Sequence, residues 1–584
     1  MIPKRWHLLT PEPARAQEIA RTLSIPPVLA QLLLHRGVAS AEAARRFLSC
    51  SLADLHDPAD LPGATEAAER LLTAVRAGRR ICIYGDYDVD GITGATLLWR
   101  CLRLAGGKVD YYVPDRFDEG YGLNAGALRK LKDHGVDTVV TVDCGISAIE
   151  EAALARDLGL ELIITDHHEL KAELPPADVL VHPRLPRSNY PFPQLCGAGV
   201  AFKLAWAVGQ RLSQTRKVSD AFREFLLESV ALVALGTVAD VVPLWGENRI
   251  FVRHGLRSLQ SGPSIGLQAL LAAAKLDQNQ LLNSEHIGFT LAPRLNAAGR
   301  LGSARLAIEL LATQTPARAE DLARYLTAQN EQRQTVERRI FAAAKEQIEA
   351  LGDLEAVHAL VLADPAWHPG VIGIVASRLV ERYARPVLLV ANRDEPAQGS
   401  GRSVEGFPLH EALAACGQHL LSHGGHAMAA GFKLRPGALD AFRADFLAVA
   451  AQRLRQQPLR HTLRIDAEVP LAAVTAGLIK GIAMLEPFGQ GNPRPHFLAA
   501  GLRLVGTPRK VGAAERHLSF KVQQEQGPSF RAVAFGMGER HEELLAGGGD
   551  CSLVFTPRKN EWNGFTSIDL HVIDFQPAAR PVLV

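Results

Sequence analysis

Cysteine is scarce in this 584-residue chain, and its seven cysteines are scattered and form no C-x-x-C pair. Neither a disulfide framework nor a structural zinc site is therefore expected. Long apolar runs are also missing, because the stretch from 230 to 245 is too short for a membrane span and contains Asp240. The beginning, MIPKRWHLLTPEPARAQ, lacks the apolar region of a signal peptide. These absences lead us to expect a soluble protein of the reducing cytoplasm.

An excess of charge of one sign is absent too. The 64 Lys and Arg residues balance 62 Asp and Glu residues, which leaves a formal net charge of +2. This balance excludes a histone-like polycation, so a nucleic-acid site would have to be a local groove of positive charge. Because 47% of the residues are hydrophobic and only 22% are charged, the chain can build sizeable cores. Its length predicts roughly three to five domains.

Patterns of helix and strand divide the sequence into five segments. Residues 1–60 carry short helical patterns and form an N-terminal helical segment. Residues 61–314 alternate helix and strand patterns, such as EAAERLLTAVRAG followed by RRICIYG, which predicts an α/β domain with a doubly wound parallel sheet. Residues 315–354 predict a long connecting helix, and 355–458 a second α/β domain. In 459–584, short β patterns broken by Gly, Pro and Asn turns predict a small β-barrel.

The strongest chemical signal is the segment ICIYGDYDVDGITG, in which an apolar strand leads to Asp86, Asp88 and Asp90. Three carboxylates within five residues repel one another unless a cation lies among them. One alternative is an EF-hand, which begins D-x-D-x-D-G, but this chain has Leu97 where the EF-hand needs a bidentate Glu. A solvated acidic turn is the other alternative.

Later segments supply further metal-ligand side chains. The strand pattern VVTV leads to Asp143, and LIIT leads to Asp166, His167 and His168. Because the carboxyl ends of parallel strands meet at one crevice, these side chains are expected to converge. Asp240 lies in the apolar segment VADVVPL, where an unpaired charge would be costly; an exposed helix position is the alternative for this residue.

Carboxylates with one or two imidazoles are typical ligands of Mn²⁺ or Mg²⁺ rather than of zinc. Two such ions about 4 Å apart can activate a water and neutralise the charge of a phosphodiester. The sequence therefore predicts phosphoester hydrolysis with two divalent cations. It contains neither a GxxxxGK[ST] loop nor HExxH, so nucleotide-driven motor activity and zinc-protease chemistry are not indicated.

Eight motifs follow one another in the order GDYDVDGITGA, VDCG, TDHHE, VADVVPL, PRLNAAGRLGSA, HPGVIGIVASRL, GSGRS and GGHAMAAGF. Together they resemble the DHH phosphoesterase superfamily and, within it, the RecJ family of bacterial single-strand-specific exonucleases. The resemblance covers roughly residues 20–575. It implies that the parallel-sheet domain is a DHH domain, that the second α/β domain is a DHHA1 domain and that the barrel is an OB-fold.

The resemblance also implies the metal ligands Asp88, Asp90, Asp143, His167 and Asp240. For Asp86 it leaves open whether the carboxylate binds metal directly or supports a ligand. His168 matches the second histidine of the DHH motif, which is expected to contact substrate or orient a ligand; a packed structural histidine is the alternative.

Phosphate recognition needs cationic side chains and backbone N–H groups. By resemblance, Ser400 and Arg402 would hold a 5′ phosphate in the DHHA1 domain, and Arg294 or Arg300 would contact the scissile region. The remaining candidates for substrate contact lie on the same motifs, on turns or in the barrel, and they are Asn296, Arg116, His423, His426 and Trp562. A surface ion pair is an equal alternative for Arg116. Trp562 is expected to be exposed for stacking, because it lies in the turn-like KNEWNG.

The predicted phosphoester hydrolysis and the resemblance together imply a 5′-to-3′ exonuclease that is specific for single-stranded DNA, releases 5′-mononucleotides and acts in recombination and repair. One alternative is a DHH phosphodiesterase for short oligonucleotides or cyclic dinucleotides. Another is a catalytically inactive DHH scaffold in replication. The resemblance further implies a monomer without membrane contact that works with single-strand binding protein and a RecQ-type helicase.

Overall fold

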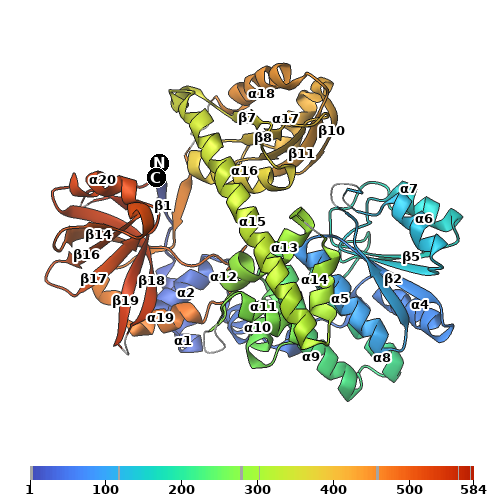
Figure 1. Ribbon diagram of the computed structural model, residues 1–584. Coiled ribbons are helices and arrows are strands. Elements are labelled where there is room, and N and C mark those ends of the chain that lie inside the picture. The colour runs from blue at the N-terminus through green and yellow to red at the C-terminus, as the bar shows by residue number, and fades with distance from the viewer. Residues whose placement is uncertain are drawn as a thin grey trace. The chain divides into compact units, whose positions relative to one another are not determined.

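The computed structural model describes residues 4–115, 119–120, 122–276, 281–301, 303–455, 460–562, 565–578 and 580–584. The chain forms two compact units. Unit 2 consists of Pro11–Asn330 with the later segment Thr475–Pro495, and unit 1 consists of Met1–Thr10, Glu331–Val474 and His496–Val584. The long helix α15 (Pro316–Glu349) contains the boundary between the two (Figure 1).

Unit 2 is built on a five-stranded sheet with the strand order β3-β2-β4-β5-β6, in which every pair of neighbours is parallel. The strands are β2 (Arg80–Gly85), β3 (Lys108–Tyr112), β4 (Thr138–Val142), β5 (Glu161–Thr165) and β6 (Val179–Val181). The chain runs from β2 outward to β3 and then returns to the other side of β2 to form β4. The order therefore reverses between β2 and β4, and the carboxyl ends of strands at such a reversal border a crevice that binds ligands.

Helices cover both faces of this sheet (Figure 1). On one face, Ile81 and Ile83 of β2 pack in a core with α4 (Ala64–Arg76), α5 (Val89–Leu104) and α8 (Gly197–Ser213). On the other face, Cys82 and Tyr84 pack with α6 (Ala125–Asp133) and α7 (Ile149–Asp157). Because both faces are buried, the strands are apolar at successive positions instead of alternating. The parallel-sheet domain predicted from the sequence is confirmed.

Further helices complete unit 2. They are α1 (Pro13–Leu23), α2 (Pro27–Leu34), α3 (Ala41–Ser49), α9 (Asp220–Ala239), α10 (Gly246–Ser261), α11 (Ile265–Ala273), α12 (Ser284–His286), the π-helix Ile287–Leu291, α13 (Ala292–Leu301), α14 (Arg305–Ala312) and α19 (Ala476–Ala483). Helix α19 and its flanks come from the range 459–584, where the sequence patterns indicate only a barrel. No described helix combines the length and the apolar character needed to cross a membrane.

Unit 1 contains the second α/β fold and the barrel. The first has the sheet order β10-β11-β9-β8-β7, formed by β7 (Leu360–Asp364), β8 (Val387–Ala391), β9 (Gln398–Arg402), β10 (Leu420–Gly425) and β11 (Ala429–Leu434). Its helices are α16 (Pro369–Tyr383), α17 (Leu409–Ala415) and α18 (Leu439–Leu454). Separately, β1 (Arg5–Leu8) pairs in parallel with β12 (Thr462–Ile465).

The barrel follows in the order β13-β14-β18-β19-β17-β16-β15, and an additional pairing of β14 with β16 closes it. Its strands are β13 (Ala467–Glu468), β14 (Phe497–Leu504), β15 (Arg509–Val511), β16 (His517–Gln524), β17 (Ser529–Ala534), β18 (Asp550–Trp562) and β19 (Phe565–Gln576), with the short helix α20 (His541–Leu545). The closed ring consists of β14, β18, β19, β17 and β16, and β13 and β15 extend it at either end. The predicted second α/β domain and C-terminal barrel are thus confirmed.

A buried ion pair ties helix α8 to helix α10. The Lys203 ammonium lies 2.5 Å from a Glu247 carboxylate oxygen, and both side chains are fully buried. Lys203 also donates to the backbone carbonyl of His56, and the Tyr190 hydroxyl donates to Glu247. Because α8 begins at the edge where the parallel strands end, this pair helps to fix the helix whose N-terminus borders the site.

We expect Lys203→Met to lower the free energy of unfolding of unit 2 by about 3 to 5 kcal/mol, because it leaves the Glu247 carboxylate buried without its counter-charge. Urea unfolding, followed by circular dichroism, measures this change. The double variant Lys203→Met with Glu247→Gln removes the stranded charge and should recover part of the loss. Equal destabilisation of the single and double variants would show that the charge is not the cause.

Candidate metal centre

The motif loop after β2 is shaped by the start of helix α5. Asp88 is the residue before the first turn, and its Oδ1 accepts hydrogen bonds from the N–H groups of Asp90 (2.9 Å) and Gly91 (3.1 Å). Gly91 allows the loop to fold back, because a Cβ there would lie 2.5 Å from the backbone oxygen of Asp86. Helix α5 starts at Val89, directly inside the acidic motif, which excludes the EF-hand alternative.

Asp90 is fully buried and faces the first turn of α8. Its two carboxylate oxygens accept hydrogen bonds from the N–H groups of Gly197 (2.5 Å) and Ala198 (2.9 Å). The N-terminus of a helix stabilises a negative charge in this way. Gly236 on α9 permits the close approach, because a Cβ there would lie 2.4 Å from Asp90 Oδ1. With Asp86 also only 3% exposed, the solvated acidic turn is excluded.

Asp143 follows β4 in the left-handed backbone region, with φ of 66°. A non-glycine residue in this region is strained, and such strain is common at functional sites. Gly197 packs against it so closely that a Cβ at 197 would lie 2.6 Å from the Asp143 Cβ. The turn therefore holds the carboxylate of Asp143 inside the crevice, where its side chain is 3% exposed.

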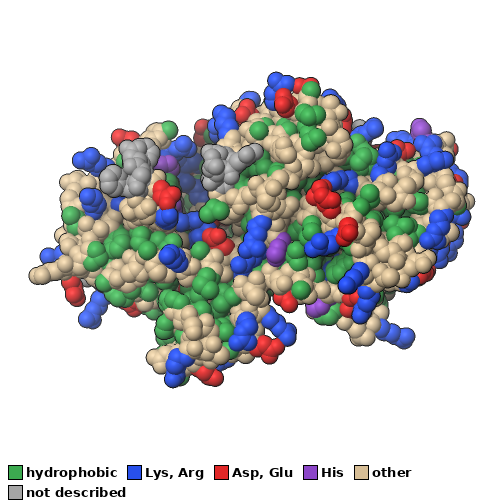
Figure 2. Space-filling model, turned by 90° about the horizontal axis from the view of Figure 1, so that it is seen from below, with side chains coloured by type: hydrophobic (Ala, Val, Ile, Leu, Met, Phe, Trp, Pro, Cys, Tyr) green, Lys and Arg blue, Asp and Glu red, His purple; other side chains and the backbone are tan. Residues whose placement is uncertain are grey.

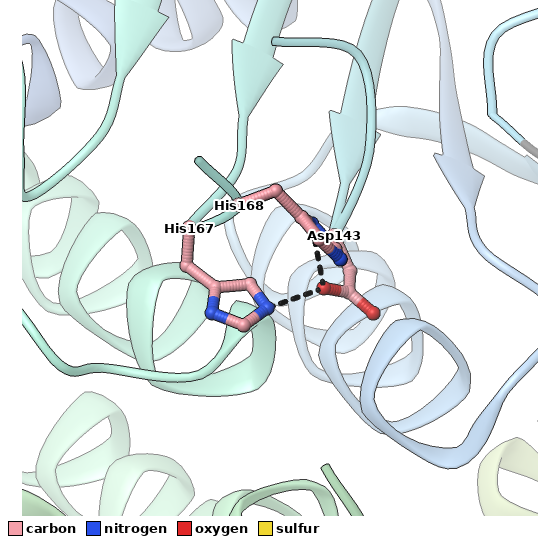
Figure 3. Close-up of side chains that lie close together, drawn as sticks. All are labelled: Asp143, His167 and His168. Atoms are coloured by element: carbon pink, nitrogen blue, oxygen red, sulfur yellow. Dashed lines mark ion pairs between the residues drawn. The ribbon is translucent and has the colours of Figure 1, made fainter. Parts of the chain in front are cut away.

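The histidines after β5 meet these carboxylates. His167 Nε2 lies 3.1 Å from Asp143 Oδ1, 3.5 Å from Asp240 Oδ2 and 3.9 Å from Asp90 Oδ2. Figure 3 shows the rings of His167 and His168 turned toward the Asp143 carboxylate. Asp240 follows α9 directly, and its side chain is 21% exposed, so it is not the exposed helix residue of the alternative interpretation.

The ligand atoms form overlapping groups in which all atoms lie within 4.8 Å of one another. One group is Asp90, His167 and Asp240, and another is Asp86, Asp88 and Asp143. These two groups share no residue, and a third group, Asp143 with His167 and His168, contains one residue from each of them. The sequence-predicted candidates therefore meet as two adjacent sets of three ligands.

The electrostatics of the cluster favour a bound cation. Burial, together with the repulsion between carboxylates, raises the pKa of Asp90 to about 6 and that of Asp240 to about 9, and it raises the pKa of Asp143 well above its usual value. Burial and the neighbouring His168 lower the pKa of His167 to about 3, so its imidazole is neutral, which is the form that binds metal. The His167 Nε2 is buried and makes no hydrogen bond to the described residues. A divalent ion would satisfy this nitrogen and stabilise the carboxylates.

His168 is held differently. Its Nδ1 lies 2.7 Å from Asp166 Oδ1, which also accepts hydrogen bonds from the backbone N–H groups of His167 and His168. Burial lowers the pKa of His168, but the hydrogen bond and charge of Asp166 outweigh burial and raise the pKa to about 9. At neutral pH this ring is a cation beside the cluster, so it is suited to an anionic group of a substrate.

Helix α13 packs on the motif loop and carries three of the predicted substrate contacts. Asn296 Oδ1 accepts a hydrogen bond from the Val89 N–H at 3.1 Å. Arg294 donates to the Thr290 carbonyl at 2.5 Å, and Arg300 lies half-buried further along the helix. The structure thus brings Asn296 into direct contact with the loop of Asp88 and Asp90.

The other predicted contacts lie elsewhere. Ser400 and Arg402 are neighbours on β9 in unit 1, where Arg402 donates to Ser400 Oγ at 3.3 Å. Gly373 of α16 faces both, and a Cβ there would lie 2.8 Å from Ser400 Oγ. His423 and His426 are exposed on the hairpin of β10 and β11. Arg116 lies outside the described residues, and so does the side chain of Trp562, the last residue of β18.

Sequence reasoning missed a layer of residues that position the ligands. The N–H groups of Gly197 and Ala198 bind Asp90, and only the glycines at the start of a helical pattern could have indicated them. His182 contacts the His168 carbonyl at 2.8 Å, and Arg184 donates to the His167 carbonyl. His182 and Arg184 lie in a loop segment, HPR, that has no recognisable metal-site spacing.

Comparison with known proteins finds three family domains in the chain. Residues 80–237 match the N-terminal domain of the DHH family, residues 355–452 match the DHHA1 domain, and residues 465–574 match the RecJ OB domain. A curated relative, the single-stranded-DNA-specific exonuclease RecJ of Bacillus subtilis, is 38% identical over 98% of this chain and 70% of its own length. The protein of the same name from Escherichia coli is 36% identical over 90% of this chain and 92% of its own.

Solved structures are similar as well. The crystal structure of RecJ from Thermus thermophilus in complex with Mn²⁺ has a TM-score of 0.83 and 34% identity, and it covers 99% of this chain and 80% of that chain. The corresponding structure with Mg²⁺ has a TM-score of 0.77 and 33% identity, with 99% and 79% covered.

We expect Asp166→Ala to weaken Mn²⁺ binding by about 10- to 100-fold, the usual effect of removing a residue that orients metal ligands. Asp166 itself lies outside the two ligand sets and acts through the backbone N–H groups of both histidines and the ring of His168. Isothermal titration calorimetry measures the affinity. Asp178→Ala is the matched control, because Asp178 also accepts a backbone hydrogen bond, from Leu162, but at the opposite end of β5. An unchanged affinity in the Asp166 variant would contradict the positioning role.

Proposed function

The chain belongs to the RecJ family of single-stranded-DNA-specific exonucleases, and we propose that it degrades single-stranded DNA from the 5′ end and releases 5′-mononucleotides. The observation that carries this proposal is the buried cluster of carboxylates and His167 at the point where the strand order reverses. Such a set of ligands at the carboxyl ends of parallel strands is suited to phosphodiester hydrolysis.

Two divalent cations, Mn²⁺ or Mg²⁺, fit the cluster. Asp90, His167 and Asp240 would hold one ion, and Asp86, Asp88 and Asp143 the other. Two adjacent sets without a shared residue support two ions, and the predominance of oxygen ligands supports Mn²⁺ or Mg²⁺ over zinc. When bound, such ions supply a water of lowered pKa and positive charge next to the phosphoryl oxygens.

The chain itself positions the substrate. His168, kept cationic by Asp166, would bind a phosphate oxygen, and Arg294 and Arg300 on α13 would contact the phosphates near the cleaved bond. Asn296 fixes α13 against the metal-binding loop, so a displacement of α13 would also displace this loop. Ser400 and Arg402, which lie together on β9, would hold the 5′ phosphate and so set the polarity.

Other parts of the proposal rest on the family resemblance. Arg116, His423, His426 and Trp562 would contact the strand outside the centre. From the sequence patterns we infer the domain limits 1–60, 61–314, 315–354, 355–458 and 459–584, whereas in the structure residues 1–10 group with unit 1 and residues 475–495 with unit 2. We also infer a cytoplasmic, monomeric enzyme of recombination and repair that works with single-strand binding protein and a RecQ-type helicase.

A digest of a 5′-phosphorylated single strand tests substrate and polarity. With Mn²⁺, we expect a 5′ label to appear at once in a mononucleotide, whereas a 3′ label remains on progressively shorter strands. A chelator should stop both reactions, and a blunt duplex should resist. Early release of the 3′ label would contradict the polarity. Activity on a dinucleotide alone would favour the phosphodiesterase alternative.

We expect Asp143→Asn to lower kcat by about 10² to 10³ or more, because it removes one charged group from the centre while the fold around it is retained. Strand binding by fluorescence anisotropy should remain. Asp178→Asn, a carboxylate at the other end of the sheet, should be fully active. Unimpaired repair by cells that carry Asp143→Asn would instead support a scaffold without catalysis.

A further inference from the structure

One carboxylate joins two helices of unit 1. Glu337 on α15 lies 2.6 Å from the guanidinium of Arg378 on α16, and 2.6 Å from the guanidinium of Arg333 one turn earlier on α15. The Arg378 guanidinium also lies 4.8 Å from the centre of the Phe341 ring, one turn later on α15. All four residues belong to unit 1, so the link lies within that unit. Arg378 therefore ties α16 to α15 at two points.

This link differs from the ion pairs at the surface. Figure 2 shows charged side chains of both signs spread over one face of the molecule, and pairs between such exposed groups contribute little, because water screens them. Glu337 and Arg333 are each only 8% exposed. Burial of charged groups is costly, so a buried ion pair is weak evidence of stability. Its geometry is more informative, because charge-assisted hydrogen bonds fix the distance and the direction between two helices.

Apolar side chains pack α16 against both α15 and the sheet. Val375 and Leu379 of α16 share one core with Ile340 of α15, Leu362 of β7 and Leu389 of β8. Hydrophobic packing is non-directional, so it leaves the rotation of a helix and its position along its own axis less sharply defined. The hydrogen-bonded pair of Glu337 and Arg378 supplies the missing direction.

Helix α16 also touches the two residues that would hold the 5′ phosphate. A Cβ at Gly373 would lie 2.8 Å from Ser400 Oγ and 3.2 Å from the Arg402 guanidinium, so the helix backbone rests directly on these side chains. Successive residues of a strand point to opposite faces, and on the other face of β9 a Cβ at Gly401 would lie 2.3 Å from the Leu388 side chain. The strand is thus packed closely on both sides. A displacement of α16 must therefore move Ser400 and Arg402 or leave them without support.

We propose that Glu337 is a positioning residue that sets the preference for a 5′ phosphate over a 5′ hydroxyl; this inference rests on the proposed function. Glu337 acts through α16, whose position determines where Ser400 and Arg402 stand. Arg402 donates to Ser400 Oγ at 3.3 Å, so the two groups are gathered in one place. Their hydrogen bonds to a phosphate weaken steeply when the donors are misaligned. A 5′ hydroxyl offers no charge to Arg402, so its binding does not depend on this alignment.

The test compares two strands that differ only at the 5′ end. Both have about 12 nucleotides and the same 3′ label, and one carries a 5′ phosphate whereas the other carries a 5′ hydroxyl. Fluorescence anisotropy with a chelator measures binding while the strands stay intact. We expect the wild type to prefer the phosphorylated strand and Arg402→Ala to bind both equally. Glu337→Gln should reduce the preference about 3- to 10-fold and leave the affinity for the hydroxyl strand unchanged.

A second variant and a control separate positioning from general loss of structure. Arg378→Met breaks the same link from the side of α16, and because Arg378 is half-exposed, we expect this variant to fold. It should lower the preference as Glu337→Gln does. Glu411→Gln is the matched control, because Glu411 pairs with Arg453 at 3.2 Å and so joins α17 to α18 of the same unit. The control should keep the preference of the wild type.

The inference is overturned if Glu337→Gln and Arg378→Met keep the preference of the wild type. It is also overturned if they lose affinity for both strands by the same factor, which is the result of a purely structural role. A wild type that binds both strands equally would overturn the phosphate pocket and this inference together. Failure of the proposed hydrolysis has a different signature, since the wild type would then leave both strands intact with Mn²⁺.

Discussion

Mutual repulsion among buried carboxylates is the constraint on which the rest of unit 2 depends. Asp86, Asp90 and Asp143 are at most 3% exposed and lie within reach of one another. Burial of one unpaired carboxylate is already costly, and each neighbour adds to the cost. The raised pKa values of Asp90, Asp143 and Asp240 express this conflict. A bound divalent cation resolves this conflict, so the cluster identifies the centre of the protein's chemistry more directly than any single motif.

Backbone groups and missing side chains allow the carboxylates to come together. The first N–H groups of α8 bind Asp90, and glycines at 91, 197 and 236 leave space where a Cβ would collide with the acidic loop or with a ligand. The buried pair of Lys203 and Glu247 holds α8 in its place. Stability and function are therefore linked through one helix. The contacts that fix α8 in the core also fix the N–H groups that donate hydrogen bonds to the Asp90 carboxylate.

The sequence predicted the parts of the site that have a local pattern. Strand patterns that end in Asp86, Asp143 and His167 define the edge of a parallel sheet, so the convergence followed from topology alone. The three-part α/β, α/β and barrel architecture followed from periodicity in the same way. Contacts between distant segments carry no such pattern. Nothing in the sequence around Thr475–Pro495 indicates that it packs in unit 2, because its partners, such as Leu244 and Ser284, lie about two hundred positions earlier. For Arg116 and Trp562 the sequence predicts substrate contacts, and their side chains lie outside the described structure.

Two of the described non-glycine residues with a left-handed backbone lie where metal ligands follow their elements. Asp143 has φ of 66°, and Val241, directly after Asp240, has φ of 59°. For a β-branched residue such as Val241 this conformation is especially unfavourable, and it persists only when the surrounding structure over-determines it. Here the surroundings do so, because the next residues are anchored to the segment 488–494 through Leu244 and Trp245. A relaxed turn at 241 would rotate Asp240 away from His167, which now lies 3.5 Å from it. The segment 488–494 thus also helps to hold a ligand of the proposed metal centre in place, although it lies about 250 positions later in the chain.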